Sequence, residues 1–145
     1  MILELAISTG MVVTTVTMHG TGLYLLGRWL RVEARVEARE QAMSGLHPRS
    51  VRHLLFLVAA VLGLFVIHGI EIWSYALLYL SLDALPDLRA AVYFSTITYA
   101  TIGYDDEGLR EAYQLIAAIE GVNGVILMGW STAFFITVVA QLGRR

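Results

Sequence analysis

The sequence predicts an all-helical membrane protein with three spanning helices, and its composition and its apolar stretches carry this prediction. The chain has 145 residues, of which 57% are hydrophobic and only 15% are charged, and its mean hydropathy is +0.67. These values lie outside the range of a soluble globular domain. Three apolar stretches, about residues 5–27, 54–82 and 112–142, each exceed the ~20 residues that a helix needs to cross ~30 Å of hydrocarbon.

Residues 1–27 are expected to form a retained N-terminal transmembrane helix. The first five residues carry Glu4 and no basic residue, and the apolar run is too long for a secretory signal. His19 within this helix is expected to make hydrogen bonds between helices rather than to serve as a ligand.

Residues 28–53 are expected to form a cytoplasmic charged helix and loop. Arginines concentrate there and at the C-terminus: Arg28, Arg31, Arg35, Arg39, Arg49, Arg52, Arg144 and Arg145. The positive-inside rule therefore places this segment and the C-terminus in the cytoplasm and the N-terminus outside. In the near-repeat 31–40, arginines and glutamates form separate columns on a helix, facing anionic headgroups, a neighbouring subunit or solvent.

The outward segment after the second apolar stretch is expected to re-enter the membrane, because residues 88–103 are too apolar for a solvated loop. Pro86 and Asp87 suit a helix start, so we expect a helix over 87–100, ~21 Å long. A cation leaving water needs oxygens in place of its hydration shell, and a run of backbone carbonyls can supply them. Gly103 allows the unusual dihedrals that such a run requires.

The residues after this helix resemble the filter signature of the potassium-channel pore family: Thr98-x-x-Thr101-Ile102-Gly103-Tyr104-x-Asp106. The order of elements is also similar over residues 54–142, with an outer helix, the pore helix 87–100, the filter 101–106 and an inner helix. The resemblance implies a four-fold pore built by a homotetramer, since one chain offers one filter segment.

By this resemblance, the ion-binding filter consists of Thr101, Ile102, Gly103, Tyr104 and Asp105. Potassium, held by filter carbonyls, is the only metal implied, and no cofactor is expected. Asp105 departs from the signature, which has a second glycine there, so potassium-selective and non-selective cation conduction both stay open.

Four copies would place Asp106 and Glu107 around the outer mouth, where they attract cations. The ring of Tyr104 would brace the filter against Tyr93, Phe94 or neighbouring subunits, or these aromatic side chains would anchor the chain at the membrane interface.

Polar residues inside the apolar helices are candidates for filter support, because a charge at membrane depth is costly. They are Thr98, Glu120 and Glu71. Glu120 is expected to contact the back of the pore helix through Thr96 or Thr98. Glu71 has no assigned partner except His68, which shares its helix face, and two such ligands do not complete a metal coordination sphere.

Three glycines of the inner helix, Gly121, Gly124 and Gly129, would let that helix bend or pack closely. Close packing is the simpler of the two.

The sequence also excludes several classes of function. It shows no nucleophile and base spacing, phosphate loop or metal-ligand cluster, so we expect no enzyme and no small-molecule substrate. The net charge of -2 has no basic excess for nucleic acid. The expected partners are membrane lipids and further copies, and the expected location is a bacterial inner membrane. The rival interpretation is a channel-like assembly protein that does not conduct.

Overall fold

The computed structural model describes residues 1–44, 49–103 and 109–143. Within these ranges, side chains are described at all positions except 32–53, 111 and 142–143. The described elements are all helical. They are α1 (Ile2–Ser44), α2 (Arg49–Ser81), α3 (Leu88–Tyr99), a short 3-10 turn η1 (Glu111–Tyr113) and α4 (Gln114–Gly143). The all-helical prediction is therefore confirmed.

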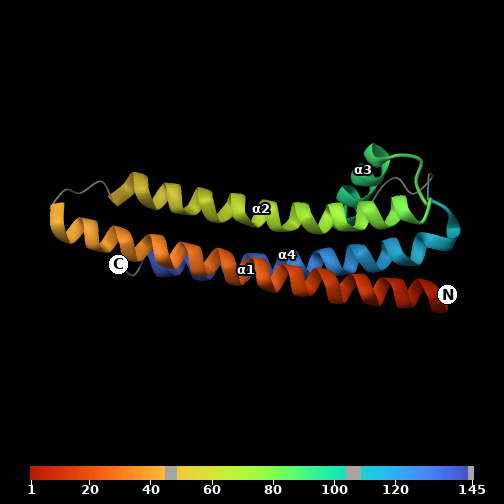
Figure 1. Cartoon of the computed structure of the whole chain (residues 1–145), viewed down its shortest axis with the longest axis horizontal. Helices are drawn as coiled ribbons and strands as arrows, with labels where there is room; N and C mark the ends of the chain where they lie inside the picture. Colours follow the sequence, from red (N-terminus) through yellow and green to blue (C-terminus); the bar gives the residue numbers. More distant parts are fainter. Residues whose placement is uncertain (45–48, 104–108, 144–145) are drawn as a thin grey trace.

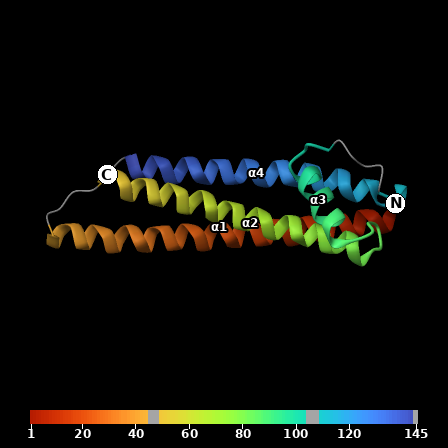
Figure 2. The same cartoon turned by 90° about the horizontal axis from the view of Figure 1, so that it is seen from above.

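Three helices are long and apolar enough to cross a membrane, over Ile2–Arg31, Leu54–Ser81 and Gln114–Gln141. They run side by side along the long axis, with α3 at the same end as the N-terminus and the C-terminus at the opposite end (Figures 1 and 2). The expectation of three spans with a short helix between the second and the third is confirmed.

The charged segment differs from expectation in how it joins the spans. Helix α1 continues without a break through residue 28 to Ser44, and α2 begins at Arg49 rather than at residue 54. Arginine, glutamate and alanine are good helix formers, so the backbone hydrogen bonding of each span continues into its polar extension. The arginine and glutamate columns of residues 32–40 lie outside the described side chains.

Helix α3 begins where the sequence predicts it. Asp87 is the N-cap, with φ -155 and ψ 170, and its side-chain oxygen accepts a hydrogen bond from the amide of Ala90 at 2.8 Å. This bond satisfies one of the free amides of the first turn. Pro86 precedes the cap, and the helix ends at Tyr99, within one residue of the expected range 87–100.

Helix α3 is held against α2 and α4 by a cluster of buried aromatic and aliphatic side chains. Tyr79 of α2 meets Phe94 of α3 edge to face, with ring centroids 5.3 Å apart and planes at 89°. Ala91 of α3 and Ile116 of α4 are fully buried in the same cluster. Since buried side chains cover the inner face of α3, its position relative to α2 and α4 is fixed by packing.

Helix α1 packs against α2 and α4 through small residues and polar contacts. A side chain at Gly63 of α2 would collide with the side chain of Leu26 of α1, so Leu26 packs directly over the bare backbone of α2 there. The Asn123 amide of α4 donates a hydrogen bond to Thr15 of α1 at 2.8 Å and another to Tyr75 of α2 at 3.3 Å. One α4 side chain therefore joins the first two helices.

Candidate functional site

The end of α3 is a tight, hydrogen-bonded turn. The amide of Thr101 donates to the carbonyl of Thr98 at 3.0 Å, and the amide of Ile102 donates to the carbonyl of Ile97 at 2.8 Å. This is the Schellman pattern, which places the residue after the C-cap, here Ala100, in the left-handed region. That residue is Thr101, with φ 58. A β-branched residue in this conformation is strained by about 1–3 kcal/mol.

The same hydrogen bonds set the direction of the backbone carbonyls. The amide of Gly103 also donates to the carbonyl of Ile97, at 3.1 Å, and Gly103 has φ 48. In a trans peptide each carbonyl points opposite to the next amide, and the described residues contain no cis peptide bond. Because three successive amides point back at α3, the carbonyls of residues 100–102 all point away from it.

This segment borders a hollow on one side of the chain. The hollow has a volume of about 470 Å³, and its walls include Thr98, Thr101, Ile102, Gly103, Gly121 and Val122. Thr101, Ile102 and Gly103 are exposed in the single chain. The predicted filter residues that the structure describes therefore lie on an open face beside α4.

Two inner-helix glycines lie against the C-terminal end of α3. A side chain at Gly124 would overlap the backbone carbonyl oxygen of Tyr99, and one at Gly121 would come within 3.4 Å of the carbonyl oxygen of Thr98. Gly129 has nothing within 4 Å of such a side chain. Since α4 is one continuous helix, the surroundings of Gly121 and Gly124 favour the close-packing interpretation.

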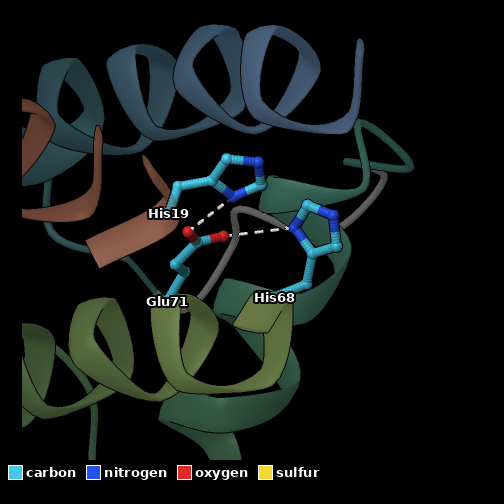
Figure 3. A group of neighbouring side chains, drawn as sticks. All are labelled: His19, His68 and Glu71. Carbon is cyan, nitrogen blue, oxygen red and sulfur yellow. Dashed lines mark hydrogen bonds and ion pairs between the residues drawn. The ribbon is translucent and has the colours of Figure 1, made fainter. Parts of the chain in front are cut away.

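A fully buried carboxylate lies behind the last residue of α3. Glu71 of α2 accepts a hydrogen bond from the Tyr99 hydroxyl at 2.5 Å. Its carboxylate oxygens also lie within hydrogen-bonding distance of two imidazoles. His19 Nδ1 is 2.9 Å from Oε1, and His68 Nδ1 is 3.1 Å from Oε2 (Figure 3). Glu71 lies well inside the span Leu54–Ser81, so α3 reaches from the end of the bundle to this depth.

Glu120 of α4 contacts the back of α3, but through a residue that the sequence analysis did not name. Its Oε1 accepts from the Ser95 hydroxyl at 2.5 Å, and its Oε2 accepts from the Tyr79 hydroxyl at 2.7 Å. The expectation that Thr96 or Thr98 makes this contact is wrong, because the two oxygens of Glu120 accept from Ser95 and Tyr79 instead. The Thr96 hydroxyl bonds instead to the carbonyl of Val92, one turn earlier.

Four of the predicted site residues lie outside the described residues: Tyr104 and Asp105 of the filter, and Asp106 and Glu107 of the outer mouth. Tyr93, one of the aromatic residues expected to support Tyr104, is half exposed, whereas Phe94 is buried against Tyr79.

The sequence analysis missed Tyr99, Ser95 and Tyr79 as partners of the buried glutamates. Periodicity offered a partial signal, since Ser95 and Tyr99 are four residues apart and lie on one face of α3. Which face meets α2 and α4 depends on how the helices pack, and the sequence does not state that.

Comparison with known proteins identifies the pore region. A family model described as "Ion channel" matches residues 54–141, which covers α3, the segment after it and the described spans of α2 and α4. No curated protein and no solved structure matches the chain.

Proposed function

Because this chain belongs to the ion-channel family, we propose that it conducts cations passively across a membrane, potassium above all, through a pore formed by four copies. The observation that carries this proposal is the run of three successive carbonyls, from residues 100–102, directed away from the end of α3. Carbonyl oxygens that four copies direct toward a common axis can replace the hydration shell of a cation.

The proposed ion path runs along Thr101, Ile102, Gly103, Tyr104 and Asp105. Exposed backbone of this kind is tolerated at membrane depth only where it is buried in protein or lines a polar path. Thr101 and Gly103 both have positive φ, which supports a segment whose backbone is shaped for something other than regular secondary structure.

Four copies are proposed because one filter segment offers carbonyls on one side only. Only 17%, 11% and 22% of the residues in the three apolar windows are buried within the chain. Much apolar surface is therefore left for lipid and for further copies. The open face at Thr101 and Ile102 would then meet the same face of its neighbours around a common axis.

Potassium over sodium is the finer part of the proposal. Asp105 stands where the filter signature has a second glycine, and aspartate adopts left-handed backbone more readily than most residues. Asp106 and Glu107 would form an acidic ring that attracts cations to the mouth. Non-selective cation conduction is the second candidate, favoured by the same Asp105.

The proposed orientation has the N-terminus and α3 outside and the C-terminus in the cytoplasm of a bacterial cell. Helix α1 runs from the end of the bundle at α3 toward the opposite end (Figure 1), and Arg28 and Arg31 follow the first apolar stretch along this helix. Arginines of short loops stay on the cytoplasmic side, which supports a filter open to the exterior.

The test is flux through purified protein in liposomes, driven separately by potassium, sodium and chloride gradients. The native chain is compared with Asp105→Gly, which restores the second glycine of the signature. Potassium flux without sodium or chloride flux would support the full proposal. Equal potassium and sodium flux in the native chain, with a preference for potassium in Asp105→Gly, would establish the non-selective alternative.

A control variant shows whether a change in flux is specific to the proposed filter. Asp83→Asn changes an exposed residue outside the proposed filter and should leave flux unchanged. If tetramers form and neither the native chain nor Asp105→Gly passes any ion, conduction is refuted under those conditions and the assembly protein becomes the better explanation.

A further inference from the structure

We propose that His19, His68 and Glu71 form a binding site for a divalent transition metal ion of the zinc class, buried behind the proposed filter and separate from the ion path. The sequence analysis expected potassium as the only metal, because His68 and Glu71 offer two ligands. The structure adds a third, His19, from a helix 52 residues away in sequence.

The three side chains converge on one point. One ligand atom from each lies within 4.8 Å of the other two. Figure 3 shows both imidazoles with Nδ1 turned toward the two carboxylate oxygens of Glu71, His19 from α1 and His68 from α2. The nitrogen to oxygen distances are 2.9 and 3.1 Å.

These separations suit a tetrahedral zinc ion after a small adjustment. Zinc binds nitrogen and carboxylate oxygen at ~2.0–2.2 Å, so ligand atoms on its tetrahedron lie roughly 3.4 Å apart. The two nitrogen to oxygen pairs, which involve different oxygens of Glu71, would each need to open by about 0.3–0.5 Å. The Tyr99 hydroxyl is a candidate fourth ligand, 2.9 Å from His68 Nδ1 and 2.5 Å from Glu71 Oε2, and it would need to move about 0.9 Å away from the carboxylate.

The outer nitrogens of both imidazoles are oriented by a single hydroxyl. His68 Nε2 lies 2.9 Å from Ser131 Oγ, and His19 Nε2 lies 3.4 Å from the same oxygen. Metal-binding histidines usually hold their other ring nitrogen in a hydrogen bond, which fixes the tautomer and the ring orientation. Ser131 therefore serves as a positioning residue that keeps both Nδ1 atoms directed at Glu71.

Proton balance gives a second reason to consider a metal. When both Nδ1 atoms carry protons for Glu71, both Nε2 atoms of the neutral rings are acceptors, yet the Ser131 hydroxyl has one proton to donate. A metal ion at the Nδ1 atoms removes this mismatch, because each ring then carries its proton on Nε2. The two ring protons move from Nδ1 to Nε2, where the Ser131 oxygen can accept from both rings, and no net proton is released to solvent.

The ligand types indicate which class of metal the site would bind, and the exposure of His68 indicates the side on which the site is accessible. Two imidazoles and one carboxylate suit zinc and its first-row neighbours better than magnesium or calcium, which prefer oxygen. The His19 and Glu71 side chains are fully buried, but the His68 side chain keeps 18% of its surface exposed. It borders a largely apolar cavity of about 650 Å³ that is also lined by Tyr99 and Ser131, so His68 is the side of the site nearest to open space.

The experiment uses the full chain purified in detergent, stripped with a chelator and titrated with Co²⁺ and Zn²⁺. We expect one metal ion per subunit, the visible absorption bands of four-coordinate Co²⁺, and displacement of Co²⁺ by Zn²⁺. Zn²⁺ should also raise the thermal unfolding midpoint, because it binds the folded chain. In His19→Gln and His68→Gln the bands and the midpoint shift should disappear, and in Ser131→Ala affinity should fall ~10–100-fold.

The matched control removes the two histidines outside the proposed site, in the double variant His47→Gln, His53→Gln, which should bind as the native chain does. Binding that survives in His19→Gln and His68→Gln, or that is lost in the double variant, would overturn the proposal. X-ray absorption at the zinc edge of the native protein needs no variant. A shell with two imidazoles is the expected result, and a shell of oxygens alone would equally overturn the site.

Discussion

The hydroxyl of Tyr99, the last residue of α3, lies 2.5 Å from Oε2 of Glu71 on α2. Glu71 in turn meets His19 of α1 at 2.9 Å. The residues that follow Tyr99 are those proposed to bind ions, so the position of the filter depends on a polar connection that runs through α2 to the additional N-terminal helix.

Replacing this hydroxyl should weaken the connection without leaving a hole. In Tyr99→Phe, Glu71 and His68 each lose one buried hydrogen-bond partner, which should cost about 1–3 kcal/mol of folding free energy. Unfolding of the purified protein in detergent measures this loss. Tyr24→Phe, at an exposed position of α1, is the control and should change stability little; equal effects of the two variants would contradict the proposed connection.

Truncating Glu120 should destabilise the contact between α3 and α4. In Glu120→Ala, the hydroxyls of Ser95 and Tyr79 lose a buried acceptor, so we expect a loss of about 2–4 kcal/mol in detergent unfolding. Glu120→Gln keeps one acceptor oxygen and should lose less than half as much. A Gln114→Ala change at the exposed start of the same helix provides the baseline, and no difference from it would refute the assigned role.

Two glycines of α4 give a matched pair for the packing interpretation. In Gly124→Ala the new methyl group overlaps the Tyr99 carbonyl oxygen, so α3 must move, and we expect lower stability and reduced cation flux. Gly129→Ala meets nothing within 4 Å in the chain and should gain roughly 0.5–1 kcal/mol from helix propensity. If bending at these glycines matters more than packing, Gly129→Ala will reduce flux as well, and liposome assays can show this.

The contribution of the N-cap of α3 to stability can be tested by substitutions of Asp87, which is exposed. Asp87→Ala removes the acceptor for the Ala90 amide and should cost ~1 kcal/mol. Asp87→Asn keeps a capping oxygen and should be close to native. Hydrogen exchange at the first turn of α3 reports the difference directly, and equal protection in both variants would show that the cap contributes nothing.

Sequence reasoning reached the fold because membrane spans and helix caps are local signals. The three apolar stretches and the Pro86-Asp87 start are read from neighbouring residues, and the structure places helices there. The boundaries of the charged extensions were less accurate, since Arg and Glu residues neither stop nor start a helix. The backbone of α1 therefore passes residue 28 without a break.

The partners of the buried polar residues could not be read in the same way. His19 and Glu71 are separated by 52 positions, and only the packing of α1 on α2 brings them together. For Glu120 the expected helix was right and the expected residue was wrong, because Ser95 and Thr96 differ by 100° around α3. The roles of Tyr104, Asp105, Asp106 and Glu107 stay predictions.

The unbroken course of α1 has a mechanical consequence. At 1.5 Å per residue, the 43 residues of this helix form a rod ~65 Å long, and Ser44 lies about 38 Å from His19. A rigid rod of this length that tilted by about 5° about His19 would move its far end by ~3 Å. A force acting on Ser44 would therefore act as a torque on the part of α1 that packs against α2 and α4.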